Sequence, residues 1–169
     1  MARKITLYGI LTAFCIVLGY IESLFPLLFI APGVKLGLSN AAVLLLIAFG
    51  DIKGALAVNT SRILLNGILF SGFSSLLFSL SGAMGSMLIM ILLCKIKQIS
   101  IIGCSIAGGA VHNILQGAVA VFIMGKAVFY YFPILIICGG ASGAIIGIST
   151  LLLKKHIKSD FFKKIETKR

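Results

Sequence analysis

Hydrophobic residues in this chain form six long runs, separated by short groups of polar, charged or turn-forming residues. The runs cover residues 5–24, 36–50, 54–70, 76–94, 99–124 and 133–153. An α-helix needs roughly 20 apolar residues to cross the hydrocarbon core of a membrane, and the second and third runs are shorter than this. The pattern predicts an all-α bundle of six transmembrane helices.

The breaks between the runs contain residues that favour turns. Phe25-Pro26 ends the first run, and the segment that follows, up to Lys35, is itself largely apolar. Residues 71–75 (SGFSS) are rich in serine and glycine, so we expect a loop there. Charged turns are expected at residues 51–53 and 95–98.

Composition supports a membrane protein and excludes an ordinary soluble domain. Of the 169 residues, 60% are hydrophobic and 11% are charged, and the mean hydropathy is +1.17. Soluble globular proteins carry about 25% charged residues, which they need to coat a surface in water. The basic residues of this chain lie mainly in the turns and in the tail.

The distribution of positive charge predicts how the helices are oriented. The net charge is +11, and seven of the fifteen Lys and Arg residues lie after Leu153. Basic residues stay on the cytoplasmic side of a membrane, where anionic lipids attract them. We therefore expect residues 1–153 to form a domain in the cytoplasmic membrane with both termini inside. Residues 154–169 form a basic cytoplasmic tail rather than a nucleic-acid-binding arm, because no aromatic-basic recognition motif accompanies them.

Polar side chains inside the predicted helices are the candidate functional residues, because such groups are costly in a bilayer. Asn59, Arg62 and Asn66 are spaced to share one face of a helix. The other candidates come from four further segments: Glu22, Lys35, Asn40, His112, Asn113 and Gln116.

The predicted topology places most of these side chains in the outer half of the membrane, with Arg62 and His112 near its midplane. The inner half holds few polar groups. This gradient predicts a binding pocket that opens to the outside. Lys35 and Arg62 outnumber the one nearby carboxylate, Glu22, which favours an anionic or partly anionic ligand.

Each of these residues also has a purely structural interpretation. Arg62 could pair with Glu22 and lock two helices together. His112 and Gln116 could form hydrogen bonds between helices, worth about 0.6 to 2 kcal/mol each. Lys35 could be an ordinary lysine at the membrane interface. The sequence leaves these alternatives open.

Small residues repeat every four positions on two of the predicted helices. Gly139, Gly143 and Gly147 form one ridge, which we expect to pack within the bundle, and Gly9 with Ala13 begins a second. Ridges of this kind allow helices to approach closely. The ridge on the first helix could instead face a partner protein.

Several catalytic signatures are missing from the sequence. It has no P-loop pattern for ATP, and its four acidic residues are far apart. An enzyme that acts on a diphosphate would need clustered carboxylates to hold Mg²⁺ against it. The four cysteines show no metal-binding spacing. We therefore expect neither an enzyme nor a resident metal or cofactor.

Three segments resemble signatures of the Gx transporter family, whose members are often labelled heptaprenyl diphosphate synthase component I. They are PGVKLGLSN, NTSRILLNGILFSG and IIGCSIAGGAVHNILQGAVA. That family is similar to the substrate-binding S components of energy-coupling factor (ECF) transporters. The resemblance implies a six-helix protein that captures a vitamin, flavin or quinone-like micronutrient from outside. It also implies a membrane coupling subunit and a pair of ATPases as partners, with Gly9, Ala13 and Val17 facing the coupling subunit.

Two function hypotheses follow from the sequence. The first is a substrate-binding membrane subunit for a small solute. The second is a non-catalytic membrane partner in polyprenyl diphosphate or quinone metabolism, which would hold or deliver a lipid to a separate catalytic subunit.

Overall fold

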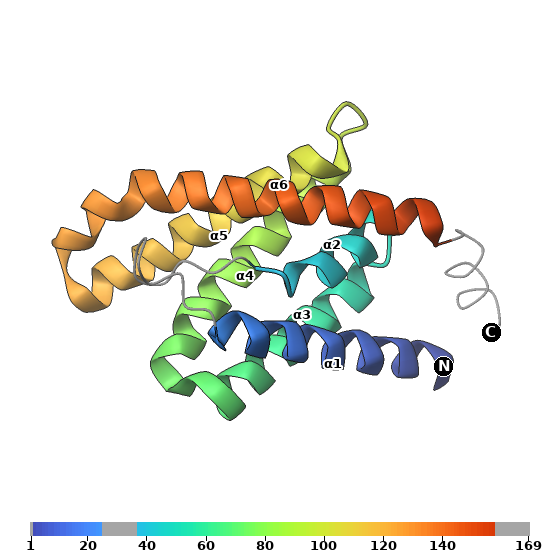
Figure 1. The fold of residues 1–169 in the computed structure, drawn as a ribbon, viewed down its shortest axis with the longest axis horizontal. Coiled ribbons are helices and arrows are strands. Elements are labelled where there is room, and N and C mark those ends of the chain that lie inside the picture. The colour runs from blue at the N-terminus through green and yellow to red at the C-terminus, as the bar shows by residue number, and fades with distance from the viewer. Residues whose placement is uncertain (1, 25–36, 158–169) are drawn as a thin grey trace.

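A computed structural model describes residues 2–24 and 37–157, and almost all of them are helical (Figure 1). Six α-helices make up most of this part of the chain, with no strand among the described residues. A π-helical segment and a 3-10 segment join two pairs of them. In chain order the elements are α1 (Ala2–Leu24), α2 (Asn40–Ala48), α3 (Ile52–Asn66), η2 (Gly67–Ser71), α4 (Gly72–Cys94), α5 (Ile101–Met124), η3 (Lys126–Tyr131) and α6 (Phe132–His156).

Four of the helical segments are long and apolar enough to cross a membrane: Ala2–Glu22, Leu76–Cys94, Ile101–Met124 and Lys126–His156. The chain is therefore a multi-pass membrane protein with an all-helical fold, as the sequence predicted. The helices α2 and α3 have only 9 and 15 residues, fewer than the roughly 20 that a span requires. Six spans with both termini inside thus remain a prediction.

The helix α2 is shorter than the predicted helix at 36–50 because two glycines limit it. Gly37 has a φ of 70° and Gly50 has a φ of 85°, both in the left-handed region that ends a helix. At about 1.5 Å per residue, the nine residues of α2 span about 14 Å. They lie at the centre of the molecule, where α2 packs against α3, α4 and α6.

The described core is built around α2. Val43, Leu44 and Leu46 have at most 1% of their surface exposed. Ala55 and Val58 of α3, Met87 and Met90 of α4 and Ile146 of α6 belong to the same hydrophobic cluster. A short central helix surrounded by longer helices explains why its residues are apolar on every side.

The predicted loop at residues 71–75 is wrong. The chain is helical there, since the π-helical segment η2 leads directly into α4. A Cβ added at Gly67 would lie 2.5 Å from the end of the Leu76 side chain, so η2 packs closely against the start of α4. Backbone groups inside a membrane must bond within the chain, which keeps serine- and glycine-rich residues helical when water is absent.

The glycine ridge of α6 packs within the bundle, as expected. A Cβ at Gly143 would lie 2.4 Å from the carbonyl oxygen of Ser105 in α5. Gly139 faces Gly109 in the same way, and Gly147 lies against the backbone of Ile102. The two longest helices therefore approach each other backbone to backbone, side by side in Figure 1.

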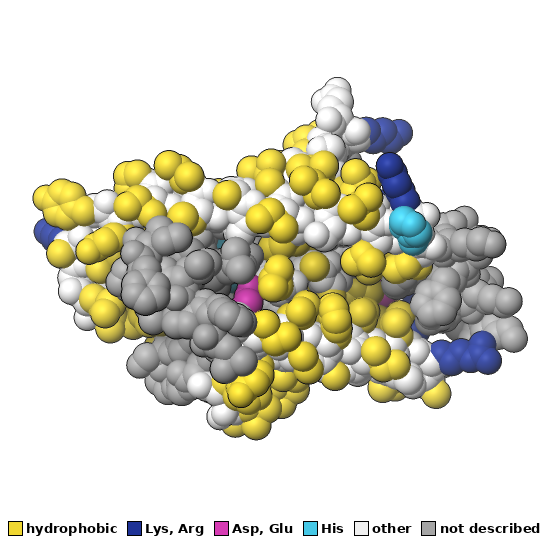
Figure 2. All heavy atoms as spheres, in the orientation of Figure 1, with side chains coloured by type: hydrophobic (Ala, Val, Ile, Leu, Met, Phe, Trp, Pro, Cys, Tyr) yellow, Lys and Arg dark blue, Asp and Glu magenta, His cyan; other side chains and the backbone are white. Residues whose placement is uncertain are grey.

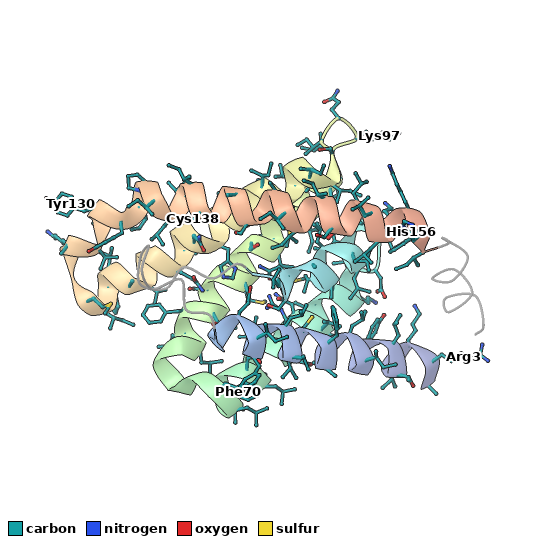
Figure 3. All side chains as sticks on the ribbon, in the orientation of Figure 1. Arg3, Phe70, Lys97, Tyr130, Cys138 and His156 are labelled. Carbon is teal, nitrogen blue, oxygen red and sulfur yellow. The ribbon has the colours of Figure 1, made fainter. Side chains whose placement is uncertain are left out.

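One end of the bundle carries basic side chains, and a hydrogen bond there joins α6 to the C-terminus of α2. Figure 3 places Arg3, Lys97 and His156 toward this end, opposite Tyr130. In the interior of this end, Nζ of Lys154 donates to the carbonyl oxygen of Ala48 at 2.8 Å, at the C-terminus of α2. Elsewhere the surface in Figure 2 is largely hydrophobic along the long helices, as expected for contact with lipid.

Candidate functional site

Arg62 is the centre of a buried polar network between α2 and α3. The residue is 5% exposed, and its guanidinium donates hydrogen bonds through all three nitrogens. Nε and Nη2 donate to Oδ1 of Asn59 at 3.1 and 2.7 Å. Nη1 donates to Oγ of Ser39 at 2.6 Å, and Nη2 also donates to Oδ1 of Asn40 at 2.5 Å. Each of these acceptors is a neutral oxygen.

Asn59 connects Arg62 to α4. Its side chain is fully buried, and Nδ2 donates to the carbonyl oxygen of Ala83 in α4 at 3.2 Å. The sulfur of Met87 lies 3.5 Å from the same nitrogen. Because both ends of the amide are engaged, Asn59 fixes Arg62 against α4 and does not itself line the cavity described below.

The N-terminus of α2 is arranged around the same guanidinium. Ser39 occupies the N-cap position, yet its side chain makes no capping bond to the helix; its hydroxyl accepts from Arg62 instead. The N-terminus of a helix carries a partial positive charge. The guanidinium and this helix end therefore place two positive centres together, and the oxygens of Ser39 and Asn40 lie between them.

A cavity of about 80 Å³ opens beside this network. Four of its polar lining residues were predicted and come from three helices: Glu22 of α1, Arg62 and Asn66 of α3, and His112 of α5. Asn40 of α2 is a fifth. The remaining lining residues are Gly19, Gly37, Ser39, Ile63, Gly67, Phe70, Ser79 and Ala83.

Glu22 and Arg62 line the same cavity without bonding to each other. Oε1 of Glu22 accepts from the backbone N–H of Leu38 at 2.6 Å, which joins the end of α1 to the residues that precede α2. The hydrogen bonds of Arg62 within the described chain all go to Ser39, Asn40 and Asn59. Glu22 still acts on Arg62 through its charge, so the structural alternative of an electrostatic pair between α1 and α3 remains beside the binding interpretation.

Asn66 and His112 complete the polar wall. Oδ1 of Asn66 is buried and has no hydrogen-bond partner among the described residues, and its amide lies against Gly19, where a Cβ would be 2.7 Å from Nδ2. His112 is 9% exposed and packs against Gly82 of α4. Two polar side chains from opposite sides of the bundle therefore face one small space.

The structure does not bring Asn113 and Gln116 to the cavity. Nδ2 of Asn113 donates to the carbonyl oxygen of Leu135 at 2.9 Å, so this residue links α5 to α6. Gln116 is buried against Gly82 of α4. Asn113 is therefore a polar contact between helices, whereas Gln116 meets α4 through its Cγ methylene and its interhelical hydrogen bond remains a prediction. Lys35, also expected in the pocket, lies outside the described residues.

Ser39 is a polar site residue that sequence reasoning missed. It stands directly before Asn40 and just outside α2, where a serine is ordinarily a helix cap. The available signal was an intramembrane arginine in need of several acceptors near a helix end rich in hydroxyl and amide groups. Phe70 and Ser79 were also missed, because their segment was divided by a predicted loop.

The ridge on α1 faces away from the cavity. Gly9 and Ala13 are exposed, and Val17 is 55% exposed. A Cβ added at Gly9 would meet no atom within 4 Å. The ridge thus lies on the outer surface of the bundle, and its role in docking remains a prediction.

A family model described as heptaprenyl diphosphate synthase component I matches residues 11–153. The match includes every residue that lines the cavity. Comparison with curated proteins and with solved structures finds no match.

Proposed function

The chain belongs to the heptaprenyl diphosphate synthase component I family, and we propose that it is a substrate-binding membrane subunit. In this proposal the cavity beside Arg62 holds a small anionic or partly anionic solute that enters from outside the cell. The chain then delivers the solute to an ATP-driven transporter of the ECF type in the cytoplasmic membrane. The bound class would include vitamins and flavin or quinone-like molecules, of which the described cavity of about 80 Å³ would hold only the anionic group.

The observation that carries this proposal is the buried guanidinium at the edge of a cavity, held only by neutral oxygens. No carboxylate is hydrogen-bonded to Arg62 among the described residues, although the charge of Glu22 in the same cavity acts on it, and the N-terminus of α2 adds to the local positive potential. A carboxylate or phosphate in the cavity would neutralise both positive centres. Charge-assisted bonds of this kind are about twice as strong as neutral ones.

The remaining cavity side chains suit a ligand that also has hydrogen-bonding groups. Glu22 can accept from a donor, and Asn66 offers a buried oxygen with no described partner. Small-molecule sites generally combine an apolar lining with a few such polar groups. Ile63, Phe70 and Ala83 supply the apolar part.

Energy for uptake would come from partner proteins, because the sequence has no ATP-binding P-loop. The outward ridge of Gly9, Ala13 and Val17 is the surface proposed to contact a coupling subunit. Its small residues would allow close helix packing inside the bilayer.

Binding of candidate solutes to the purified protein tests the pocket. Each solute is titrated into wild type, Arg62→Gln and the control Gln98→Ala, whose side chain is exposed in the α4–α5 turn. Loss of a buried charge-assisted contact costs about 2 to 5 kcal/mol, so the Kd of Arg62→Gln should rise at least about thirtyfold. Asn66→Ala serves as a second variant if Arg62→Gln does not fold. If neither substitution changes the Kd, the ligand does not bind in this cavity and the assignment of the pocket is wrong.

A second candidate function follows from the family description, which names a component of a prenyl diphosphate synthase. In this alternative the chain is a non-catalytic membrane partner that holds or delivers a lipid substrate. Affinity purification from native membranes separates the two. Co-purified ATPases with a membrane coupling protein favour transport, whereas a co-purified prenyl synthase whose activity rises with this chain favours the alternative.

A further inference from the structure

The 3-10 segment η3 exposes a group of aromatic side chains at the tip of the α5–α6 hairpin. Phe129, Tyr130 and Tyr131 are 56%, 87% and 44% exposed, and no residue of η3 is buried. Lys126 begins the segment and is also exposed. In Figure 3 Tyr130 lies at the end of the molecule opposite the basic residues Arg3 and Lys97.

The distance from this tip to the basic end matches the thickness of a bilayer. Phe132 begins α6, and Lys154 and Lys155 lie in its last turn, 22 and 23 positions later. At about 1.5 Å per residue this interval is about 33 Å. The hydrocarbon core of a membrane is about 30 Å thick. When the two lysines lie at one boundary of the hydrocarbon, η3 lies just beyond the other.

The side chains of η3 are suited to the membrane interface rather than to the hydrocarbon or to bulk water. In the hydrocarbon, the ammonium of Lys126 and the phenolic hydroxyls would lack partners at high cost. In bulk water, the exposed ring of Phe129, stacked on Phe132 with centroids 5.1 Å apart, would gain nothing from its exposure. Tyrosine is enriched at membrane interfaces, where the ring lies among lipid and the hydroxyl meets water.

We propose that η3 is an interfacial anchor. Tyr130 and Tyr131 lie at the level of the lipid headgroups on the face of the membrane opposite the basic end, and Lys126 contacts the lipid phosphates. The anchor and Lys154 with Lys155 together fix the depth of α6. This inference rests on the membrane-spanning helices and is independent of the proposed ligand.

The sequence allows a direct test because it contains no tryptophan. Tyr130→Trp, Ile137→Trp and Ile145→Trp each create one fluorescent reporter, and all three positions are exposed on the hairpin. Each variant is reconstituted into phosphatidylcholine vesicles. The lipids are brominated near the headgroup, halfway along the acyl chain or near its end, and tryptophan quenching then reports depth.

Tyr130→Trp should be quenched at least about twofold more by the shallowest bromines than by the deepest. Ile137→Trp lies five positions, or about 8 Å, beyond the start of α6 at Phe132 and should respond most to the intermediate lipid. Ile145→Trp should respond most to the deepest. The proposal is overturned if Tyr130→Trp shows the emission of tryptophan in water and no quenching by any of the lipids. It is equally overturned if the deepest bromines quench Tyr130→Trp most.

Discussion

Arg62 illustrates how a charged residue is retained inside a membrane protein. A guanidinium offers five N–H donors in a planar fork, and the acceptors of Ser39, Asn40 and Asn59 meet most of them. Ser39 gives up its ordinary capping role to do so. The side chain is thereby fixed in one orientation before any ligand arrives, and preorganisation of this kind lowers the cost of binding.

At the residue scale, Asn59→Ala should destabilise the protein by about 1 to 3 kcal/mol, because the buried guanidinium loses an acceptor of two hydrogen bonds. Thermal or denaturant unfolding of purified protein in mild detergent measures this loss. Gln98→Ala is the control, since it removes an exposed amide and should leave stability unchanged. Equal stability of the two variants would contradict the described network.

The sequence identified most of the residues of this site. It did not indicate which of them line the cavity and which contact neighbouring helices. The spacing of Asn59, Arg62 and Asn66 correctly placed them on one helix, since all three lie in α3. It could not indicate that Asn59 turns toward α4 while Asn66 lines the cavity. Periodicity assigns residues to a face, whereas the neighbouring helices decide which atoms meet.

At the scale of elements, the α5–α6 pair depends on glycines at defined positions. Backbone atoms of α5 occupy the space beside Gly139, Gly143 and Gly147, so these positions cannot adjust by rotating a side chain. Neighbouring Gly140 has only a methyl group of Ile106 at 3.8 Å, an ordinary contact. Close packing against α5 therefore requires glycine at three positions of α6 but not at Gly140.

Gly143→Ala and Gly140→Ala form a matched pair on this helix. Gly143→Ala should cost about 1 to 3 kcal/mol, because its Cβ overlaps the carbonyl oxygen of Ser105. Gly140→Ala should be neutral or stabilising by up to about 1 kcal/mol, since alanine favours helix. Unfolding in detergent measures both. A Gly143→Ala protein as stable as Gly140→Ala would contradict the close packing of α5 on α6.

The C-terminus of α2 provides a second prediction for an element. Lys154→Ala removes the bond to the carbonyl oxygen of Ala48 and the contact of its ammonium with the ring of Phe49, 5.7 Å away. We expect a loss of about 1 kcal/mol, the usual size of a cation at a helix C-terminus. Lys155→Ala, an exposed neighbour, should change the unfolding midpoint little. Identical midpoints for the two variants would argue against the bond.

Element boundaries were less predictable from sequence than element types. Long apolar runs gave α1, α5 and α6 nearly complete. The short helix α2 was overestimated because an apolar run continues through positions whose glycine dihedrals end the helix. The predicted loop at residues 71–75 failed because turn propensities reflect competition with water, which is absent from a bilayer.

At the scale of the whole molecule, the polar cavity and the basic end lie at different depths. Arg62 is 11 residues beyond the N-cap Asp51 of α3, or about 16 Å from the basic end. With one boundary of a bilayer about 30 Å thick placed at the basic end and α3 running across it, the cavity would begin near the middle. A pocket at this depth is closed toward the basic end by the buried residues of α2 and the contacts of Lys154.

The orientation of the molecule gives a prediction that cells can test. The positive-inside rule places the α4–α5 turn in the cytoplasm and η3 outside. Gln98→Cys and Ala127→Cys introduce thiols at exposed positions in these two segments. A membrane-impermeant maleimide should label Ala127→Cys in intact cells and Gln98→Cys only after permeabilisation, above the background of the native cysteines. The reverse labelling pattern would show that the molecule has the opposite orientation in the membrane.

The most direct test of the central claim, that the cavity beside Arg62 holds a small solute, is native mass spectrometry of protein gently purified from cell membranes. Wild type should retain a small molecule that dissociates on collisional activation, and Gln98→Ala should retain it equally. Arg62→Gln and Asn66→Ala should lose it while remaining folded. The claim is contradicted if folded wild type carries no such mass, or if both cavity variants retain it at the wild-type level.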